Sequence, residues 1–540
     1  MNKAVLSLLA LALPVSMFAQ SQGTLSGDLQ TNLNFFQKDE KIGAAGNPLY
    51  DNYLSGGEAW LSVRYNVNNW TFTSRFDAFH NSNLLNPSSA MTAYGLGAYS
   101  ITKEMDDLTV TVGSIYDQIG SGILFRSYED RGLLIDNGLM GLGLKYKLPK
   151  QHLLLKAFGG QQRYAPGGQQ EHIYELYNPI IAAINAEGDY TVGKANITPG
   201  VGILNRTLDA ASMTTITSNI NSQELNTRFE PRYNMYAFSA YNTLNYKSIQ
   251  WFIEGDYKTH EAIPDTALGT TKLVDKPGNV VFTTLNYARK GFAVNVSAKR
   301  TENFFMRTSP NEVLLKGMLN WQPVVARQRP ERLISRYTPA SQDLSEMAST
   351  VDVLYNPSEK TTFTFTYTNI DRLDKSKLYR ELFGEVVLDG LGPWKVQAGA
   401  QYLEYNMTIY RTKPQPFLFA ITPYVELTYL INGSKSLRME LQYMNTKQDY
   451  GSWVFGLLEY NVAPKFSLSV SDMYNIKPNY DNSDVHGAYH YPSIYGAFSK
   501  GPHRFSLAYV KQVAGINCTG GVCRYEPAFS GIKATLNTRF

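Results

Sequence analysis

Alternation of apolar and polar side chains is the feature that most restricts how this chain can fold. In the segment LSGDLQTNLNFF, residues 25–36, Ser, Asp, Gln and Asn side chains occupy one face of an extended chain. The opposite face is apolar and carries Leu25, Leu29, Leu33 and Phe35. The same two-residue period recurs in residues 251–258, 361–369 and 437–443. This period is typical of β-strands whose two faces meet different surroundings.

The sequence also lacks the apolar runs that membrane-spanning helices need. No run of about 18 or more apolar residues follows residue 19. A chain that crosses a bilayer without such runs has to form a closed barrel, because every backbone group in lipid must be hydrogen-bonded within the protein. A soluble β-sandwich alternates as well, but its turns are short at both ends. The lengths of the connections therefore distinguish the two folds.

Short and long connections alternate along the chain. Longer polar links include residues 37–56, 206–230 and 303–345, whereas tight links recur at 68–69, 103–107, 149–151, 193–194, 247–248, 289–291, 357–360, 390–393, 432–435, 463–465 and 500–503. Short periplasmic turns and long external loops are typical of outer-membrane barrels. About eleven periplasmic turns predict an all-β fold, a large closed antiparallel transmembrane barrel of roughly 22 to 24 strands.

Both ends of the chain favour the outer membrane of a Gram-negative bacterium. Lys3, an apolar stretch and a break near Ala19 predict a signal peptide at residues 1–19, so that residues 20–540 form a single barrel domain. The final segment GIKATLNTRF alternates and ends on Phe540, so it resembles the terminal strand that barrel-assembly machinery recognises. We expect this machinery, membrane lipid and lipopolysaccharide as partners. A net charge of +4 is too small to suggest nucleic-acid binding.

One segment, GSIYDQIGSGILFRSYEDRGLLIDN at residues 113–137, is too charged for lipid contact and too apolar for a solvated loop. We predict that it belongs to the third external loop and folds back into the lumen, with its apolar side chains on the wall. Its charges would form a constriction that selects solutes, as inward loops do in large porins. There Arg126 and Arg131 would face Asp117, Glu129, Asp130 and Asp136. Structural bracing and partner docking remain alternatives.

Part of this segment carries a resemblance to a known family. The block YDQIGSGILFRSYEDR, followed by Asp136 and Asn137, resembles Tyr-Asp/Glu-Gln-x-Gly-Ser-Gly-x-x-x-Arg-x-Tyr-Glu-Asp-Arg in a family of uncharacterised outer-membrane β-barrel proteins from Bacteroidota. The resemblance is specific between Tyr116 and Asn137. It implies a barrel fold and an outer-membrane location, and it implies no substrate.

The longest connection, residues 303–345, is rich in arginine. Its basic candidates are Arg327, Arg329, Arg332 and Arg336. They could attract anions into the barrel or contact the phosphates of lipopolysaccharide at the outer rim. A solvated loop with scattered charge is the third possibility.

The remaining chemistry of the sequence is sparse. Cys518 and Cys523 are the two cysteines, and their spacing in the last external loop predicts a disulfide. We expect no metal site and no cofactor, because no further metal ligands adjoin the cysteines and no phosphate-binding loop occurs. Zinc-protease and serine-hydrolase motifs are also missing, so we assign no catalytic residue. A rim enzyme would depend on pairs such as Asp77 with His80 or Asp256 with His260.

These observations favour a porin-like channel or solute transporter whose inward-folded charged loop selects a small solute. The alternative is a non-transporting scaffold that serves envelope assembly, secretion or adhesion. In the alternative, residues 113–137 and 303–345 would occlude the lumen.

Overall fold

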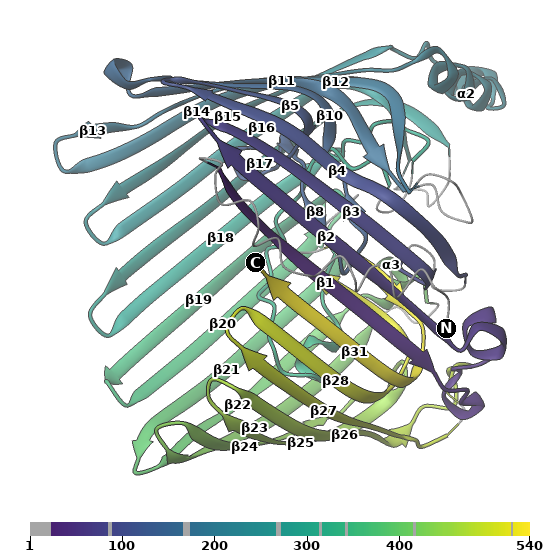
Figure 1. Ribbon diagram of the computed structural model, residues 1–540, viewed down its shortest axis with the longest axis vertical. Coiled ribbons are helices and arrows are strands. Elements are labelled where there is room, and N and C mark those ends of the chain that lie inside the picture. Colours follow the sequence, from purple (N-terminus) through teal and green to yellow (C-terminus); the bar gives the residue numbers. More distant parts are fainter. Residues whose placement is uncertain are drawn as a thin grey trace.

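The computed structural model describes residues 23–84, 89–165, 173–265, 272–312, 316–340, 344–413, 417–485, 487–519 and 522–540, without the side chains of residues 517–524. Within these ranges the chain forms one large sheet that closes on itself (Figure 1). Neighbouring strands of this sheet run antiparallel, and β12 and β13 act as one strand because both pair with β14. The barrel therefore has 24 strands, and the predicted fold class is confirmed.

The wall consists of β1 (Thr24–Phe36), β2 (Ser55–Val67), β3 (Trp70–Ser82), β4 (Met91–Met105), β5 (Leu108–Ile115), β10 (Leu139–Leu148), β11 (Leu153–Tyr164), β12 (Glu175–Gly188), β13 (Tyr190–Val192), β14 (Ala195–Thr207), β15 (Asn234–Tyr246), β16 (Ile249–Pro264), β17 (Leu273–Arg289), β18 (Phe292–Glu302), β19 (Glu346–Ser358), β20 (Thr361–Arg372), β21 (Lys377–Leu391), β22 (Trp394–Tyr405), β23 (Leu418–Asn432), β24 (Lys435–Met444), β25 (Gly451–Val462), β26 (Phe466–Pro478), β27 (His490–Lys500), β28 (His503–Gln512) and β31 (Phe529–Arg539).

The first and last strands close the ring. β1 pairs with β31 from Asp28 opposite Arg539 to Phe36 opposite Gly531. Beyond the end of β31, the backbone N–H of Phe540 donates to the carbonyl of Gly27 at 3.0 Å, and the N–H of Gly27 donates back at 2.9 Å. The last residue of the chain thus extends the seam of the barrel.

The eleven tight links of the sequence are the turns at one end of the barrel. Each of them lies at an observed strand-to-strand turn, for example between β2 and β3 or between β27 and β28 (Figure 1). At the first of these turns Asn68 and Asn69 have φ values of +48° and +63°. Asn tolerates this left-handed conformation, and it matches the two-residue turns that suit twisted antiparallel strands. The long connections lie at the opposite end.

The two faces of the wall differ as the alternation predicted. Leu25, Phe365 and Val470 project outward and are about half exposed. Inside the barrel, by contrast, the side chains of Lys258 and Lys299 are fully buried beside residues of the 303–345 loop. An apolar exterior around a charged interior is the arrangement that a bilayer requires of a barrel.

Two prolines lie within the wall without interrupting it. Pro179 falls where the pairing of β11 with β12 changes register, between the Gln161–Ile180 and Arg163–Leu176 pairs. Pro199 pairs with Asn242 of β15, at a level that the ladder between β12 and β14 does not reach. Both sites spare a ladder hydrogen bond that proline cannot donate.

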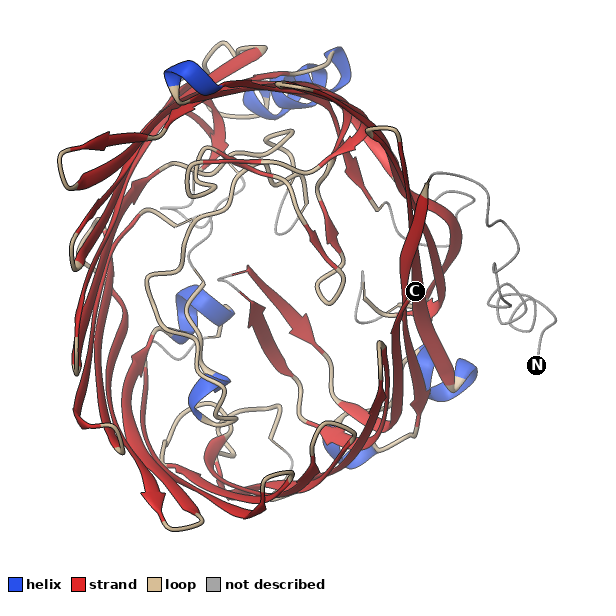
Figure 2. Cartoon of the chain, turned by 60° about the vertical axis from the view of Figure 1, so that its left-hand side comes forward, coloured by secondary structure: helices blue, strands red, loops and turns tan. Residues whose placement is uncertain are grey.

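Three of the connections turn into the barrel. Inside the ring of strands run residues 116–138, the described part of residues 303–345 and the hairpin of β29 (Gly515–Thr519) with β30 (Val522–Glu526) (Figure 2). The short helix α3 (Met407–Arg411) lies beside the second of these loops. The longer helix α2 (Ala210–Asn221) instead packs Ile216 and Ile220 onto Ala262 and Leu273 at the ends of β16 and β17. None of the helices among the described residues is long and apolar enough to cross a membrane.

The outward orientation of the apolar face can be tested with a single charge. Val470, midway along β26, is 49% exposed on the outer face. We expect Val470→Arg to lower the free energy of unfolding by about 2–4 kcal/mol, the cost of Arg near a bilayer midplane. Guanidinium unfolding of the barrel in phospholipid vesicles measures this loss. The matched control is Ser469→Arg, which places the same charge on the inner face. An equal loss in both variants would contradict the assignment of the faces.

Candidate functional site in the barrel lumen

The loop between β5 and β10 is anchored to the wall by its apolar side chains. It forms two small hairpins, β6 (Gln118–Ile119) with β7 (Phe125–Arg126), and β8 (Glu129–Asp130) with β9 (Ile135–Asp136). Ile119 and Leu124 are fully buried against Gly202 of β14, where the absence of a side chain leaves room for them. The ring of Phe125 lies 4.8 Å from that of Phe158 on β11. The loop is therefore folded inward and packed on the wall, as its composition predicted.

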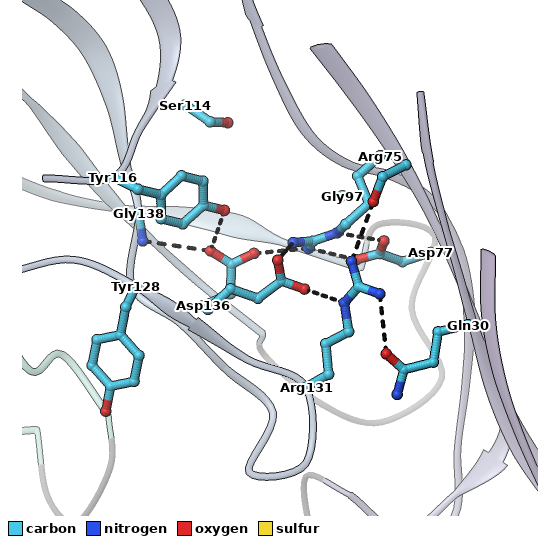
Figure 3. A network of polar contacts seen from close by, with 12 residues as sticks. Gln30, Arg75, Asp77, Gly97, Ser114, Tyr116, Tyr128, Arg131, Asp136 and Gly138 are labelled. Atoms are coloured by element: carbon cyan, nitrogen blue, oxygen red, sulfur yellow. Dashed lines mark hydrogen bonds and ion pairs between the residues drawn. The ribbon is translucent and has the colours of Figure 1, made fainter. Parts of the chain in front are cut away.

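Asp136 is the centre of a buried polar network (Figure 3). Its Oδ2 accepts from Nη2 of Arg75 at 2.8 Å, and its Oδ1 accepts from Nη2 of Arg163 at 2.5 Å. Tyr116 donates its hydroxyl to the same carboxylate at 2.8 Å. Arg75 also donates two hydrogen bonds of 2.7 Å, from Nε and Nη2, to the carboxylate of Asp77, two residues away on β3. One acid of the loop is thus held by arginines of two separate wall strands.

Charge is nearly balanced in this network. Arg75 and Arg163 face the carboxylates of Asp77 and Asp136, and all four side chains are less than a tenth exposed. Buried charges of this kind are costly unless each one is paired and hydrogen-bonded. The pairing offsets the charges of both arginines, although Nε of Arg163 makes no hydrogen bond to a described residue. The network therefore attaches this part of the loop to the wall.

Glu129 and Arg131 connect the network to the first two strands. Arg131 Nε lies 2.6 Å from Oε1 of Glu129, and Glu129 Oε2 lies 3.0 Å from Nη1 of Arg75. The guanidinium of Arg131 also reaches Asp28 of β1 at 3.4 Å and the hydroxyl of Ser62 on β2 at 3.2 Å. The inward face of β1 and β2 is therefore a second attachment of the loop.

Asp117 is fixed by lysines of the wall. Its carboxylate lies 2.9 Å from Nζ of Lys145 on β10 and 3.1 Å from Nζ of Lys156 on β11. Burial alone would raise the pKa of Asp117, but the hydrogen bond and charges of the two lysines outweigh it and hold the pKa below its usual range. Asp117 therefore stays ionised at neutral pH and ties the start of the loop to the wall.

The pairing differs from the predicted constriction in three ways. Arg131 does meet Glu129, but Asp117 and Asp136 bind wall residues and not Arg126 or Arg131. The guanidinium of Arg126 lies over two aromatic rings, 4.7 Å from the ring centroids of Tyr128 and Trp321. Asp130 accepts a hydrogen bond from the backbone N–H of Leu133 at 2.9 Å. The prediction that both arginines would face all four acids is therefore wrong in these pairings.

The sequence did not indicate the partners of the loop, although it offered Asp77 in a possible pair with His80 and placed Tyr116 in the block that carries the family resemblance. These partners are Arg75, Asp77, Lys145, Lys156 and Arg163, with Tyr116 and Tyr174 as hydroxyl partners. A local signal existed at Arg75 and Asp77, which are charged residues two apart on the inward face of an otherwise alternating strand. Such pairs are expected to point into the lumen, although their loop partners cannot be read from spacing.

The loop of residues 303–345 crosses the lumen and joins the first loop to the opposite wall. Near the first loop, the N–H of Arg126 donates to Leu319 O at 3.0 Å and that of Trp321 donates to Gly122 O at 2.9 Å. Farther along, Arg329 Nε lies 3.3 Å from Glu381 of β21. The Tyr337 hydroxyl donates to Asp449 at 2.9 Å. The two loops therefore form one hydrogen-bonded crosspiece.

The structure separates the four basic candidates of this loop. Arg327 is half exposed and lies 3.6 Å from Asp352 of β19. Arg329, Arg332 and Arg336 instead converge on one cavity inside the barrel, together with Arg411 at the end of α3. The sequence predicted a basic loop but not the contribution of Arg411, which lies in a separate connection.

Candidate enzymatic and metal sites find little support among the residues that the structure describes. No group of three or more His, Cys, Asp or Glu side chains there could hold a metal ion. Asp77 is engaged by Arg75, and His260 Nδ1 lies 3.2 Å from Asp275 instead of Asp256. The backbones of Cys518 and Cys523 pair directly across the β29–β30 hairpin, while their side chains lie outside the description, so the disulfide stays a prediction.

Comparison with known proteins places the chain in a family. The model of DUF6029, a family of unknown function, matches residues 1–540. The chain belongs to this family. No curated protein resembles the chain closely enough to be compared with it.

Among solved structures, this DUF6029 member is similar to large barrels of outer-membrane proteins. The translocation pore of the P pilus usher PapC is 10% identical, with 96% of this chain and 99% of that chain covered at a TM-score of 0.45. The FrpB iron transporter from Neisseria meningitidis is 8% identical, with 96% of this chain and 82% of that chain covered at a TM-score of 0.40. The siderophore receptor PirA from Pseudomonas aeruginosa is 8% identical, with 96% of this chain and 81% of that chain covered at a TM-score of 0.43.

The bracing role of Asp136 can be tested by removing its charge. We expect Asp136→Asn to raise the opening of residues 116–138 about 100-fold, because breaking a buried ion pair costs about 3 kcal/mol or more. Hydrogen exchange at the N–H groups of Ser127 and Asn137, which bond within the loop, measures this opening. The control is Asp130→Asn, since Asn can still accept from Leu133. Unchanged exchange in Asp136→Asn would show that the network does not hold the loop.

The disulfide of the last hairpin has a direct chemical test. Directly opposed positions of an antiparallel pair bring Cα atoms to about 4.5–5.5 Å, within the range of disulfides. We expect the folded protein, purified without reductant, to contain no titratable thiol until it is reduced. Mass spectrometry after alkylation should find Cys518 and Cys523 in one linked peptide. Alkylation of both residues before reduction would contradict the prediction.

Proposed function

We propose that this chain is an outer-membrane channel for small solutes whose lumen is restricted by two inward-folded loops. The observation that carries the proposal is the solvent exposure of charged groups beside these loops. Asp28 is 43% exposed although it meets Arg131 of the first loop. Lys145 is 48% exposed although it binds Asp117, and Arg327 of the second loop is 51% exposed. Water therefore reaches the interior around the crosspiece.

Barrel size supports a restricted channel more than an empty pore. Barrels of 16 to 18 strands already leave an aqueous channel, and wider ones carry a plugged lumen. In this chain, segments of the external loops supply the filling, and they lie across a wall lined with charged groups. Fixed charges at a narrowed bore act on permeating solutes by the same electrostatics that operates in channels.

The cellular setting is part of the same proposal. The chain would be secreted with a signal peptide at residues 1–19 and would insert in the outer membrane of a Gram-negative bacterium, in keeping with the Bacteroidota resemblance. Barrel-assembly machinery would recognise the final strand ending at Phe540. Lipid and lipopolysaccharide would contact the apolar wall and the outer rim. Catalysis, a cofactor and nucleic acid have no part in this function.

A second candidate is a non-transporting scaffold. It is favoured by one observation, the hydrogen bonds that join the two loops to each other and to opposite walls. A crosspiece fixed in this way could occlude the lumen permanently. The two functions differ in whether the barrel conducts.

Conductance in planar bilayers tests the proposal. We expect the purified protein to conduct weakly, and we expect replacement of residues 304–340 by a short Gly-Ser linker to raise the unitary conductance several-fold, because the bore loses its crosspiece. The control shortens a second long connection by removing α2, which packs at the rim and should leave conductance unchanged.

The scaffold makes the opposite prediction. The channel proposal would be wrong if the wild-type barrel and the loop-shortened barrel both folded and neither conducted ions. Folding is checked by the heat-dependent mobility of barrels in detergent gels. A protein partner that co-purifies in fixed ratio with a silent barrel would then identify the scaffold.

A further inference from the structure

A cavity inside the barrel gathers four arginines. It has a volume of about 290 Å³ and lies between the 303–345 loop, the end of α3 and the base of the β29–β30 hairpin. The basic side chains on its lining are Arg329, Arg332, Arg336 and Arg411, while Glu526 is its one acid among the described residues. Such a concentration of one charge inside a protein is costly unless something offsets it.

Two of the arginines are held in place by the wall. The side chain of Arg329 is 7% exposed, with its guanidinium 3.3 Å above the ring of Phe383 and its Nε directed to Glu381. Arg411 is also 7% exposed, and its Nη2 donates to the carbonyl of Arg336 at 2.6 Å. Its Nη1 lies 3.8 Å from Asp449, which Lys413 approaches more closely at 2.8 Å. These contacts fix both guanidinium groups at the cavity.

Several donors of these arginines remain unused. Arg329 Nη2, Arg411 Nε, and both Nε and Nη2 of Arg336 are buried and make no hydrogen bond to the described residues. Buried N–H groups normally have partners, and a charged one without a partner costs more than a neutral one. Arg336 is stacked near Trp453 at 4.8 Å and Tyr450 at 5.2 Å, which positions the group but leaves those donors open.

Arg332 gives the cavity a positive charge that Glu526 offsets only in part. It is exposed within the barrel, and no carboxylate of the described chain lies within 4.0 Å of Arg332 or Arg336. Desolvation and the charge of Arg336 lower the pKa of Arg332, and Glu526 offsets them only in part. In the sequence, residues 517–524 include no Asp or Glu. Glu381 and Asp449 pair with Arg329 and Arg411, and Glu526 is the one acid beside Arg332 and Arg336, so three acids stand against four arginines and the cavity retains a net positive charge.

We propose that this cavity binds a small oxyanion that carries more than one negative charge, such as a phosphate ester or a polycarboxylate. A planar guanidinium can donate two parallel hydrogen bonds to two oxygens of such a group, and several guanidinium groups line this cavity. The volume suits a small molecule and excludes a macromolecular segment. That the oxyanion is a permeating solute rests on the proposed channel function, whereas its binding does not.

Binding of inorganic pyrophosphate to the full-length protein in detergent, followed by calorimetry at low chloride, tests the site. We expect Arg332→Gln to weaken binding about tenfold or more, the effect of losing one charge-assisted hydrogen-bonding group. The pyrophosphate affinity of Arg332→Lys should lie between those of wild type and Arg332→Gln, because lysine keeps the positive charge but lacks the planar, two-pronged guanidinium. Arg332 makes no structural ion pair, so these variants are expected to fold.

The control is Arg327→Gln, which removes a charge from the same loop outside the cavity and should change binding less than twofold. If Arg327→Gln and Arg332→Gln lost the same pyrophosphate affinity, the effect would come from the overall charge of the loop, and the proposed site would be wrong. Wild-type protein that binds no pyrophosphate, or Arg332→Gln that binds as tightly as wild type, would overturn it too.

The outcomes also separate this site from the channel. Conductance without pyrophosphate binding would remove the site and keep the channel. Pyrophosphate binding that depends on Arg332, in a barrel that stays silent even after residues 304–340 are replaced, would keep the site and remove the channel.

Discussion

Closure of the backbone hydrogen-bond ladder is the constraint on which the rest of this structure depends. In a bilayer no water can satisfy a free strand edge, so the first and last strands have to meet. They do so between β1 and β31, and the seam extends to the terminal Phe540 opposite Gly27. Since closure fixes the inward face of every strand, it also determines which charged side chains enter the lumen.

A closed ring of this size creates a second physical problem, an interior too wide for side chains of the wall to fill. The long loops fill part of this interior, and they have to carry both apolar and charged groups. Ile119 and Leu124 anchor one loop on the wall, and Asp136 accepts the arginines that the wall presents. The mixed composition that made residues 113–137 unusual follows from these two requirements.

The sequence was sufficient for the parts of the fold that local chemistry decides. Alternation and turn residues located the eleven tight turns and gave a range of about 22 to 24 strands, because both signals act over a few residues. The site was harder, since Arg75 and Arg163 lie 61 and 27 residues from Asp136 in the chain. Arg131 and Glu129 are two residues apart, so this pair was within reach of sequence reasoning. The cavity combined Arg411 with a loop more than sixty residues upstream, and no local pattern links them.

The two inward loops differ in how their charges are used. Around Asp136 the charges of loop and wall cancel, which is the condition for a stable buried network and leaves no strong field. Around Arg332 they do not cancel, and donors of Arg329 and Arg336 remain open. A protein that needed charge only for rigidity would pair the second cluster as it pairs the first. An unbalanced cluster held in place by balanced ones is instead the arrangement expected of a binding site, because stability then comes from the brace and the open charge is left for a ligand.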